Sequence, residues 1–282
     1  MAIDVTVDDV RDNSGAPTSL ISDSTISNLI TRVTDKTASL WDIKFDPVKR
    51  IETLTGDFRR KIMVSEHFPL KVLKIQNANS SVDLTNIYVN TLEGTIEYFG
   101  DNASVTQANG YGAVFSGYAK DVSMKYLFGA VERDFDTQTE TTSSTSSGTS
   151  VTIDVDDETG FSINDYVFIE DTNEKFEVAK VTGTSTNQIT VDKLNNSFES
   201  EAIISKAKTM DIFNQYVLYE VCVAVALRAI GSTYTFNTSY SNGGVTVSKG
   251  VPYTHWNESF NRNLKLRDEM KQRIDNLLGV IA

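Results

Sequence analysis

The sequence predicts an α+β fold, because two kinds of hydrophobic periodicity occupy different parts of the chain. Apolar residues recur at helical spacing near both ends and alternate with polar residues through the middle. We therefore expect a helical core (an N-terminal helix, a buried helix and a long C-terminal helix) with a small antiparallel β region and an inserted all-β barrel or sandwich module. With 282 residues, 40% of them hydrophobic, the chain can bury such a core.

The first predicted helix spans about residues 23–40, where apolar residues follow a three-four spacing and Ser22 offers an N-cap oxygen. A second, short helix is predicted after Asp46, because Pro47 suits the first helical position and Gly56 suits the end. From there the period changes to two. The alternation predicts strands at about 57–64, 70–76, 86–90, 94–99, 112–116 and 121–127.

The stretch 137–149 consists almost entirely of Ser and Thr, which cannot bury enough apolar area to offset the entropy of ordering. We expect a linker there. Beyond it, alternating apolar runs broken by Gly160 and Gly183 predict an inserted β module over 150–206. The predicted division is therefore one discontinuous core, 1–136 with 207–282, and the module.

Helical periodicity returns in the last third of the chain. Residues 212–230 are apolar around most of the helix, which indicates a buried element. Residues 234–247 alternate around Asn242-Gly243, a favourable hairpin turn. The last predicted helix runs from Trp256 to Leu278.

Composition and charge exclude several classes of function. A net charge of -12 opposes binding to phosphate backbones, so a conventional nucleic-acid-binding protein is not expected. The acidic N-terminus lacks the pattern of a secretory signal, which predicts a protein that stays in the cytoplasm where it is made. The longest apolar run, Val221–Leu227, is too short to span a bilayer, so no membrane contact is expected.

No residue pattern indicates catalysis, a cofactor or a metal. His67 and His255 are the only histidines, and nothing marks either as a general base. Cys222 lies in an apolar run typical of a buried thiol. The acidic run that begins at Asp154 lacks the glycine and the terminal glutamate of an EF-hand loop. We therefore expect no enzyme activity.

The last helix is the candidate site for binding a partner protein. Its apolar residues lie close to one stripe, as in helices that dock into a groove of another protein. Packing against its own domain is an equal alternative. The residues of this predicted partner-binding stripe are Trp256, Phe260, Leu264, Met270, Ile274 and Leu277.

A family resemblance rests on a series of segments in the first half of the chain. They are the opening helix Ser22–Leu40, the strand His67–Ile75, the pair Ile87–Asn90 and Leu92–Ile96, and the strand Asp121–Gly129. In this order they resemble the head-tail connector (adaptor) proteins of long-tailed phages and archaeal tailed viruses. In that family a helix follows the last strand, and residues 210–230 would match it after the insertion. The resemblance covers roughly two-thirds of the chain.

The resemblance implies a structural protein of the virion neck, made in the host cytoplasm. Family members form a ring of about twelve copies that docks beneath the portal protein, contacts neighbouring neck and tail-completion proteins, and extends the DNA channel towards the tail. Genomic DNA would pass through the lumen without specific binding. The acidic charge is consistent with this, because lumenal cations would trap phosphates.

The block 137–208 departs from the shortest members of that family and leaves an alternative open. The chain could be another tail component, such as a baseplate or fibre-attachment protein, whose 150–206 module binds host glycans or a neighbouring tail protein. Exposed aromatic residues would favour glycan binding. The aromatic residues available there lie mostly at core positions, which disfavours it: Phe161, Tyr166, Phe168, Phe176 and Phe198.

Overall fold

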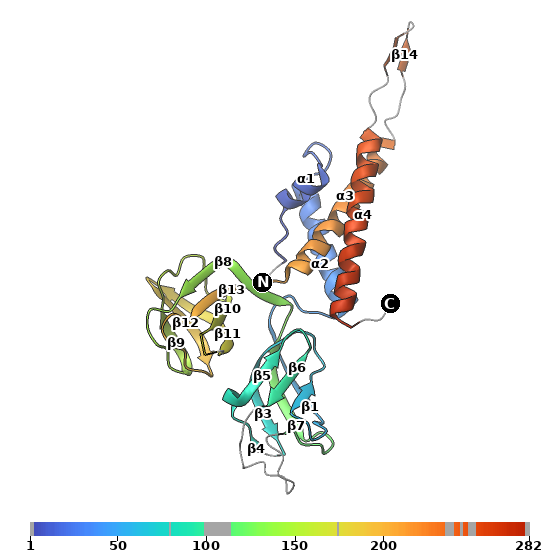
Figure 1. Cartoon of the computed structure of the whole chain (residues 1–282). Helices are drawn as coiled ribbons and strands as arrows, with labels where there is room; N and C mark the ends of the chain where they lie inside the picture. Colours follow the sequence, from blue (N-terminus) through green and yellow to red (C-terminus); the bar gives the residue numbers. More distant parts are fainter. Residues whose placement is uncertain are drawn as a thin grey trace. The chain divides into compact units, whose positions relative to one another are not determined.

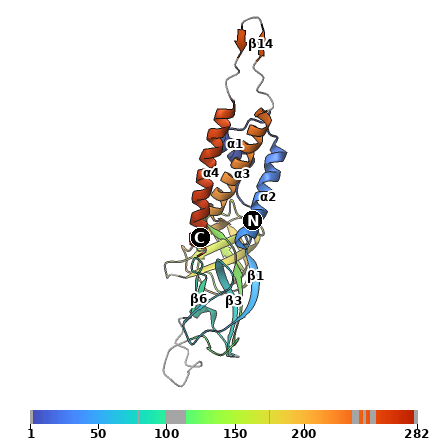
Figure 2. The same cartoon turned by 90° about the vertical axis from the view of Figure 1, so that its right-hand side faces the viewer.

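The computed structural model confirms the α+β fold and divides the chain into two compact units (Figures 1 and 2). A helical unit comprises Ile3–Asp42 and Met210–Ala282, and a β unit comprises Ile43–Thr209. These units differ from the predicted division, which grouped 1–136 with 207–282. The structure describes residues 3–78, 80–98, 114–173, 175–234, 240–242, 245–247 and 252–279.

The helical unit contains the three predicted helices and one that the sequence analysis missed. Its elements are α1 (Val7–Ser14), α2 (Asp23–Trp41), α3 (Asp211–Tyr234), the hairpin β14–β15 (Tyr240–Asn242 and Val245–Val247) and α4 (Pro252–Leu277). The missed helix α1 has clear local signals, since Thr6 and Asp9 form a capping box and Gly15 ends the helix in the left-handed region at φ 71°. The hairpin is confirmed, although Gly243 of its predicted turn lies outside the described residues.

Helix α3 is the centre of this unit and packs against the other three helices. Trp41 of α2 places its indole edge-on against Phe213 and Tyr216 of α3, with ring centroids 6.3 and 4.9 Å apart. The same indole donates a 2.7 Å hydrogen bond from Nε1 to Oδ1 of Asp275 on α4. One aromatic residue therefore joins three helices.

Helix α3 also has the length and composition of a membrane-spanning helix over Asp211–Gly231. The sequence prediction considered only the uninterrupted apolar run Val221–Leu227 and overlooked this. Half of the most apolar stretch is buried within the unit, and core helices of soluble proteins meet the same criterion. The finding is therefore weak evidence for a membrane.

Residues 43–130 of the β unit form two antiparallel sheets packed face to face, which we call the sandwich. One sheet has the order β1-β7-β3-β4 and the other β2-β6-β5. Their inner faces share one apolar core that includes Ile75, Ile96 and Met124. The bounds are β1 Val48–Leu54, β2 Lys61–Met63, β3 Pro69–Asn77, β4 Ser80–Ser81, β5 Ile87–Asn90, β6 Thr95–Tyr98 and β7 Val122–Phe128.

The prediction of a short helix after Pro47 is wrong, because this segment is the edge strand β1. It pairs along its whole length with β7, from Val48 opposite Phe128 to Leu54 opposite Val122. The apolar spacing was misleading, since Ile51 is 69% exposed and does not belong to a buried helix face. Tertiary pairing therefore overrides the local helix signal.

Two predicted strands of the sandwich also differ from the structure. The strand expected over 57–64 is confined to Lys61–Met63. Of the strand expected over 112–116, residues 114–116 are described and have no regular secondary structure, although Val114 and Phe115 are buried. The remaining four predicted strands are present as β3, β5, β6 and β7.

The inserted module is a six-stranded antiparallel barrel in the order β8-β13-β10-β11-β12-β9. A bridge between Thr141 and Val155 joins the two outer strands, and main-chain hydrogen bonds from Thr142 to Asp154 and from Asp156 to Glu140 complete the closure. The bounds are β8 Val131–Glu140, β9 Gly148–Asp154, β10 Tyr166–Glu170, β11 Phe176–Ser185, β12 Gln188–Leu194 and β13 Ile203–Thr209.

The prediction that 137–149 is a linker is wrong, because this segment forms the end of β8, the closing bridge and the start of β9. In this segment threonines take the inward positions that apolar residues usually occupy: Thr139, Thr141 and Thr145 are buried. The hydroxyl of Thr141 donates to the carbonyl of Glu199 at 3.0 Å and accepts from the amide of Ala202 at 3.0 Å. Threonine is β-branched and satisfies its own hydroxyl, so it can build a barrel seam without apolar residues.

Candidate functional site

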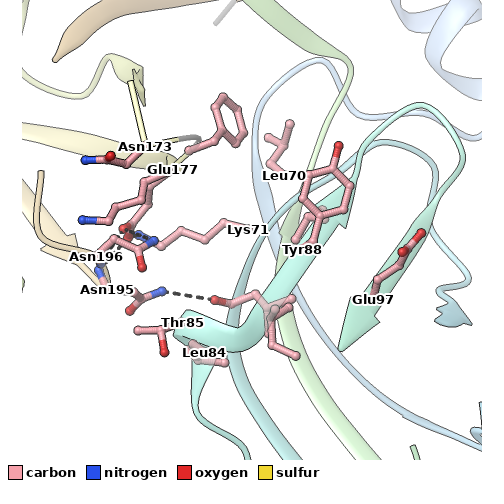
Figure 3. Close-up of a pocket in the computed structure, with 15 residues that line it drawn as sticks. Leu70, Lys71, Leu84, Thr85, Tyr88, Glu97, Asn173, Glu177, Asn195 and Asn196 are labelled. Atoms are coloured by element: carbon pink, nitrogen blue, oxygen red, sulfur yellow. Dashed lines mark hydrogen bonds and ion pairs between the residues drawn. The ribbon is translucent and has the colours of Figure 1, made fainter. Parts of the chain in front are cut away.

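A pocket in the β unit lies where the barrel meets the sandwich (Figure 3). Its volume is about 540 Å³, which is within the usual range for small-molecule or peptide sites. Strands β3 and β5 of the sandwich supply one wall. Strand β11 and the loops before β11 and after β12 supply the other.

An apolar cluster holds the barrel against the sandwich beside this pocket. Leu70 and Leu127 of the sandwich pack on Val131, Phe168, Val178 and Ala207 of the barrel. Phe176 extends the cluster, because its ring stacks on that of Phe168 with centroids 5.6 Å apart. The guanidinium of Arg133 lies 5.2 Å from the centroid of the Phe176 ring. The pocket is therefore built on a fixed junction.

A buried ion pair forms part of the pocket wall. Lys71 Nζ lies 2.5 Å from Glu177 Oε1, and the two side chains are only 7% and 2% exposed. Lys71 also donates a 3.0 Å bond to the carbonyl of Lys193. Glu177 accepts the main-chain amides of Asn195 at 2.7 Å and Asn196 at 2.9 Å. Each charge is thus neutralised and hydrogen-bonded, as a buried ion pair requires.

Amide side chains of the barrel project around the pocket. Asn195 donates from Nδ2 to the carbonyl of Val72 at 3.4 Å, and Asn196 donates from Nδ2 to Glu177 at 3.3 Å. Asn173 lines the pocket from the loop before β11 and forms no side-chain hydrogen bond with any described residue. Across from them, Tyr88 of β5 is 54% exposed (Figure 3). The pocket can therefore donate and accept hydrogen bonds on its barrel side.

The sequence analysis did not single out any residue of this pocket as a site. A signal was present, since Lys71 interrupts the apolar run Leu70–Leu73 and Glu177 interrupts Phe176–Ala179. A single charge inside a buried strand needs a partner. The partner of each charge depends on how the barrel packs against the sandwich, and a single sequence does not reveal this packing.

The predicted partner-binding stripe is largely internal to the helical unit. Trp256, Met270 and Ile274 are buried, and Phe260, Leu264 and Leu277 are half-buried. The most buried positions of α4 also include Ser259 and Asn263. Ser259 Oγ donates to the carbonyl of Ser14, 3.3 Å away on α1. The packing seam therefore runs beside Phe260 and Leu264 and leaves these two side chains partly accessible.

The other residues considered from sequence have ordinary surroundings. His255 packs edge-on against Trp256, with centroids 5.1 Å apart. Cys222 is fully buried in α3, and burial raises the pKa of its thiol to about 12. Within the described ranges, no group of three or more His, Cys, Asp or Glu side chains could hold a metal ion.

No protein family matches this chain, and no curated protein matches it either.

Proposed function

We propose that the chain is a structural protein of the virion neck, an adaptor that forms a ring beneath the portal and joins capsid to tail. The proposal rests on the resemblance of the sequence to head-tail connector proteins. One structural observation supports it most: the helix, strands and later helix that carry the resemblance occur in that order as α2, β3, β5, β6, β7 and α3.

The helical unit would supply the contact to the portal or to a neighbouring copy. Trp256 and Ile274 are committed to the core of the unit, so they hold α4 in place. Phe260, Leu264 and Leu277 are partly accessible on the same helix and are the members of the stripe that a partner can reach without unfolding. A contact of this kind uses a few apolar anchors at helical spacing.

The test combines electron microscopy of the purified full chain with immunogold labelling of tailed virus particles from the cells that encode it. We expect rings of about twelve copies, formed alone or on the portal, and label at the head-tail junction. A chain that stays monomeric in the presence of the portal, with no label on particles, would contradict the proposal.

A matched pair of variants tests the contact surface. Phe260→Asp with Leu264→Asp should abolish ring formation, because it places charges in an apolar contact. Lys271→Glu, on the exposed side of the same helix, should leave rings intact. Tryptophan fluorescence checks folding, because Trp41 and Trp256 both belong to the helical unit. Rings that survive the double change would contradict this surface.

A further inference from the structure

Strand β5 is an unpaired sheet edge that faces the pocket. It pairs on one side with β6, and no described strand pairs with its other side. The amide of Tyr98 bonds to Arg60 on the β2 side, so Tyr98 does not hydrogen-bond with Ile87, its partner in β5. Main-chain direction alternates along a strand. Tyr88 and Asn90 therefore bond to β6, whereas Ile87 and Val89 direct their main-chain groups away from it.

The outward main-chain groups of β5 have few partners. The amide of Ile87 bonds to the carbonyl of Leu84. The carbonyl of Ile87 and both main-chain groups of Val89 form no hydrogen bond with a described residue, and both residues line the pocket. Their side chains pack on the sandwich core, which fixes the strand. The edge is thus rigid and able to pair.

Strand β5 also differs in composition from two other edge strands of the sandwich, β1 and β2. The edge strand β1 carries Lys49, Arg50 and Glu52, and the edge strand β2 carries Lys61. Charged side chains of this kind discourage pairing with another chain. The sequence of β5, Ile-Tyr-Val-Asn, has no charge. Its edge therefore lacks the usual block against strand addition.

The charges around the pocket are already satisfied. Lys71 and Glu177 pair with each other, and Glu97 pairs with Lys61 at 3.2 Å. Lys175 Nζ donates to the carbonyl of Ser197 at 2.8 Å. The occupant that fits such a site is uncharged and brings its own donors and acceptors.

We infer that the pocket binds an extended, uncharged peptide segment of a partner protein, which adds as a strand to the free edge of β5. One edge of the guest strand pairs with the main chain of Val89 and the carbonyl of Ile87. Its other edge faces the amide side chains of Asn173, Asn195 and Asn196. Alternate guest side chains enter the apolar part of the pocket beside Leu84.

A saccharide fits this pocket less well than a peptide. Sugar sites use aromatic rings with open faces, but of the two aromatic residues that line the pocket, Phe176 is already engaged by Phe168 and by Arg133, and only Tyr88 lies outside this stack. A saccharide also offers the main-chain amide of Val89 no strand carbonyl with which to pair. The inference does not rest on the proposed adaptor function, because it concerns the β unit alone.

The test uses the full chain and an oriented library of acetylated, amidated hexapeptides in which Val, Ile or Leu alternates with Thr, Ser or Asn. We expect selection of peptides with micromolar affinity. The best peptide should slow hydrogen exchange at the Val89 amide, which is directed into the pocket. N-methylation of a central guest residue should weaken binding about tenfold or more, since it removes one strand hydrogen bond.

Two variants of one position make the test specific. Val89→Pro removes the outward amide without breaking the pairing with β6, and should reduce affinity for the peptide about tenfold or more. Val89→Ile keeps the amide and should bind like the parent chain. Circular dichroism confirms that both variants are folded.

Three outcomes would overturn the inference: no peptide selected from the library, equal binding by Val89→Pro and the parent chain, or no change in exchange at Val89. Binding of chitotriose or maltotriose in place of peptides would assign the pocket to glycans. Because rings and particle labelling are measured separately, the adaptor function can fail while peptide binding persists, and the reverse.

Discussion

The barrel and the sandwich are both antiparallel, yet they treat their strand edges in opposite ways. The barrel joins β8 to β9 through the Thr141–Val155 bridge, so its sheet has no free edge along this seam. The sandwich keeps open edges at β1 and β4 of one sheet and at β2 and β5 of the other. Closure gives a self-contained core, whereas an open edge leaves main-chain groups that another chain can use. Proline substitutions test each side of this contrast, and deletion of the buried ion pair tests the junction between the barrel and the sandwich.

The largest effect should come from proline inside the closed barrel. Ile169 lies in β10 between β13 and β11, pairs with Ile204 and Glu177, and is fully buried. Ile169→Pro should cost about 3 kcal/mol or more and abolish the barrel. Urea unfolding followed by circular dichroism at 215 nm measures it, with Ile169→Val as the control at about 1 kcal/mol. A barrel that melts normally with Ile169→Pro would show that its strands are not paired on both sides.

The next largest loss of stability should come from breaking the Lys71–Glu177 ion pair between the barrel and the sandwich. Glu177→Ala leaves the ammonium of Lys71 buried without a partner and frees the amides of Asn195 and Asn196, which should cost about 3–5 kcal/mol. Because both tryptophans lie in the helical unit, their fluorescence transition should not move while the circular dichroism transition does.

A double variant separates the two causes of that loss. Lys71→Met with Glu177→Leu removes both charges and should recover part of the stability, since no charge then stays buried alone. Equal destabilisation by the single and the double variant would mean that the loop amides, and not the charge, dominate.

The sequence predicts those parts of the fold whose signal is local. Helices α2, α3 and α4 carry apolar spacing over many turns, and strands β9 to β13 of the barrel alternate, so these elements were predicted correctly, whereas β8 was not predicted. Helix α1 was missed despite its local capping signals, whereas the errors at β1 and at the barrel seam occur where a partner strand decides the structure. Strand β1 has an exposed, helix-like spacing around Ile51, and residues 137–149, which supply one side of the barrel seam, are almost entirely Ser and Thr.

The candidate pocket was not predictable for a related reason. Lys71 and Glu177 are separated by more than a hundred residues, and only the docking of barrel on sandwich brings them together. Neighbouring sequence shows that each charge is out of place among apolar residues, but not that the two form one pair. Helix α4 shows a different limit of sequence patterns: Ser259 and Asn263 are buried although their residue types suggest a surface.

A smaller effect is expected in the helical unit at acid pH. Burial alone would raise the pKa of Glu220, but its bonds to Lys36 at 2.8 Å and Arg267 at 3.2 Å outweigh this and lower the pKa below 4.5. The stabilisation is therefore complete above pH 4.5 and is lost as the pH falls through the lowered value. Because Lys36 is mostly exposed, we expect only about 1 kcal/mol.

Urea midpoints from tryptophan fluorescence between about pH 6 and pH 3 measure the stabilisation that ionised Glu220 contributes, because this range brackets the ordinary pKa of glutamate. Glu220→Gln should flatten the acid-dependent fall, whereas Asp35→Asn, on the exposed face of α2, should not. A fall of the same size with Glu220→Gln would assign the acid sensitivity to other carboxylates.

The smallest effect tests the open edge itself. Val89→Pro should cost at most about 1 kcal/mol, because the amide that it removes has no partner among the described residues and only the packing of the Val89 side chain on the sandwich core is reduced. Tyr88→Pro, one residue away, removes an amide bonded to β6 and should cost about 3 kcal/mol. Equal costs at the two positions would mean that β5 is not an edge strand in solution.

The burial of Cys222 makes its thiol a natural probe for transient opening of the helical unit. It is the only cysteine in the chain, its sulfur lies 3.8 Å from the carbonyl of Val10 on α1, and its thiol pKa is raised to about 12. A thiol reagent at neutral pH therefore reacts only during moments when the helices separate. The rate of thiol labelling therefore reports how often the helices separate. If another protein binds over α1 or α3 during assembly, the labelling rate of Cys222 should fall, and no engineered cysteine is needed to measure this.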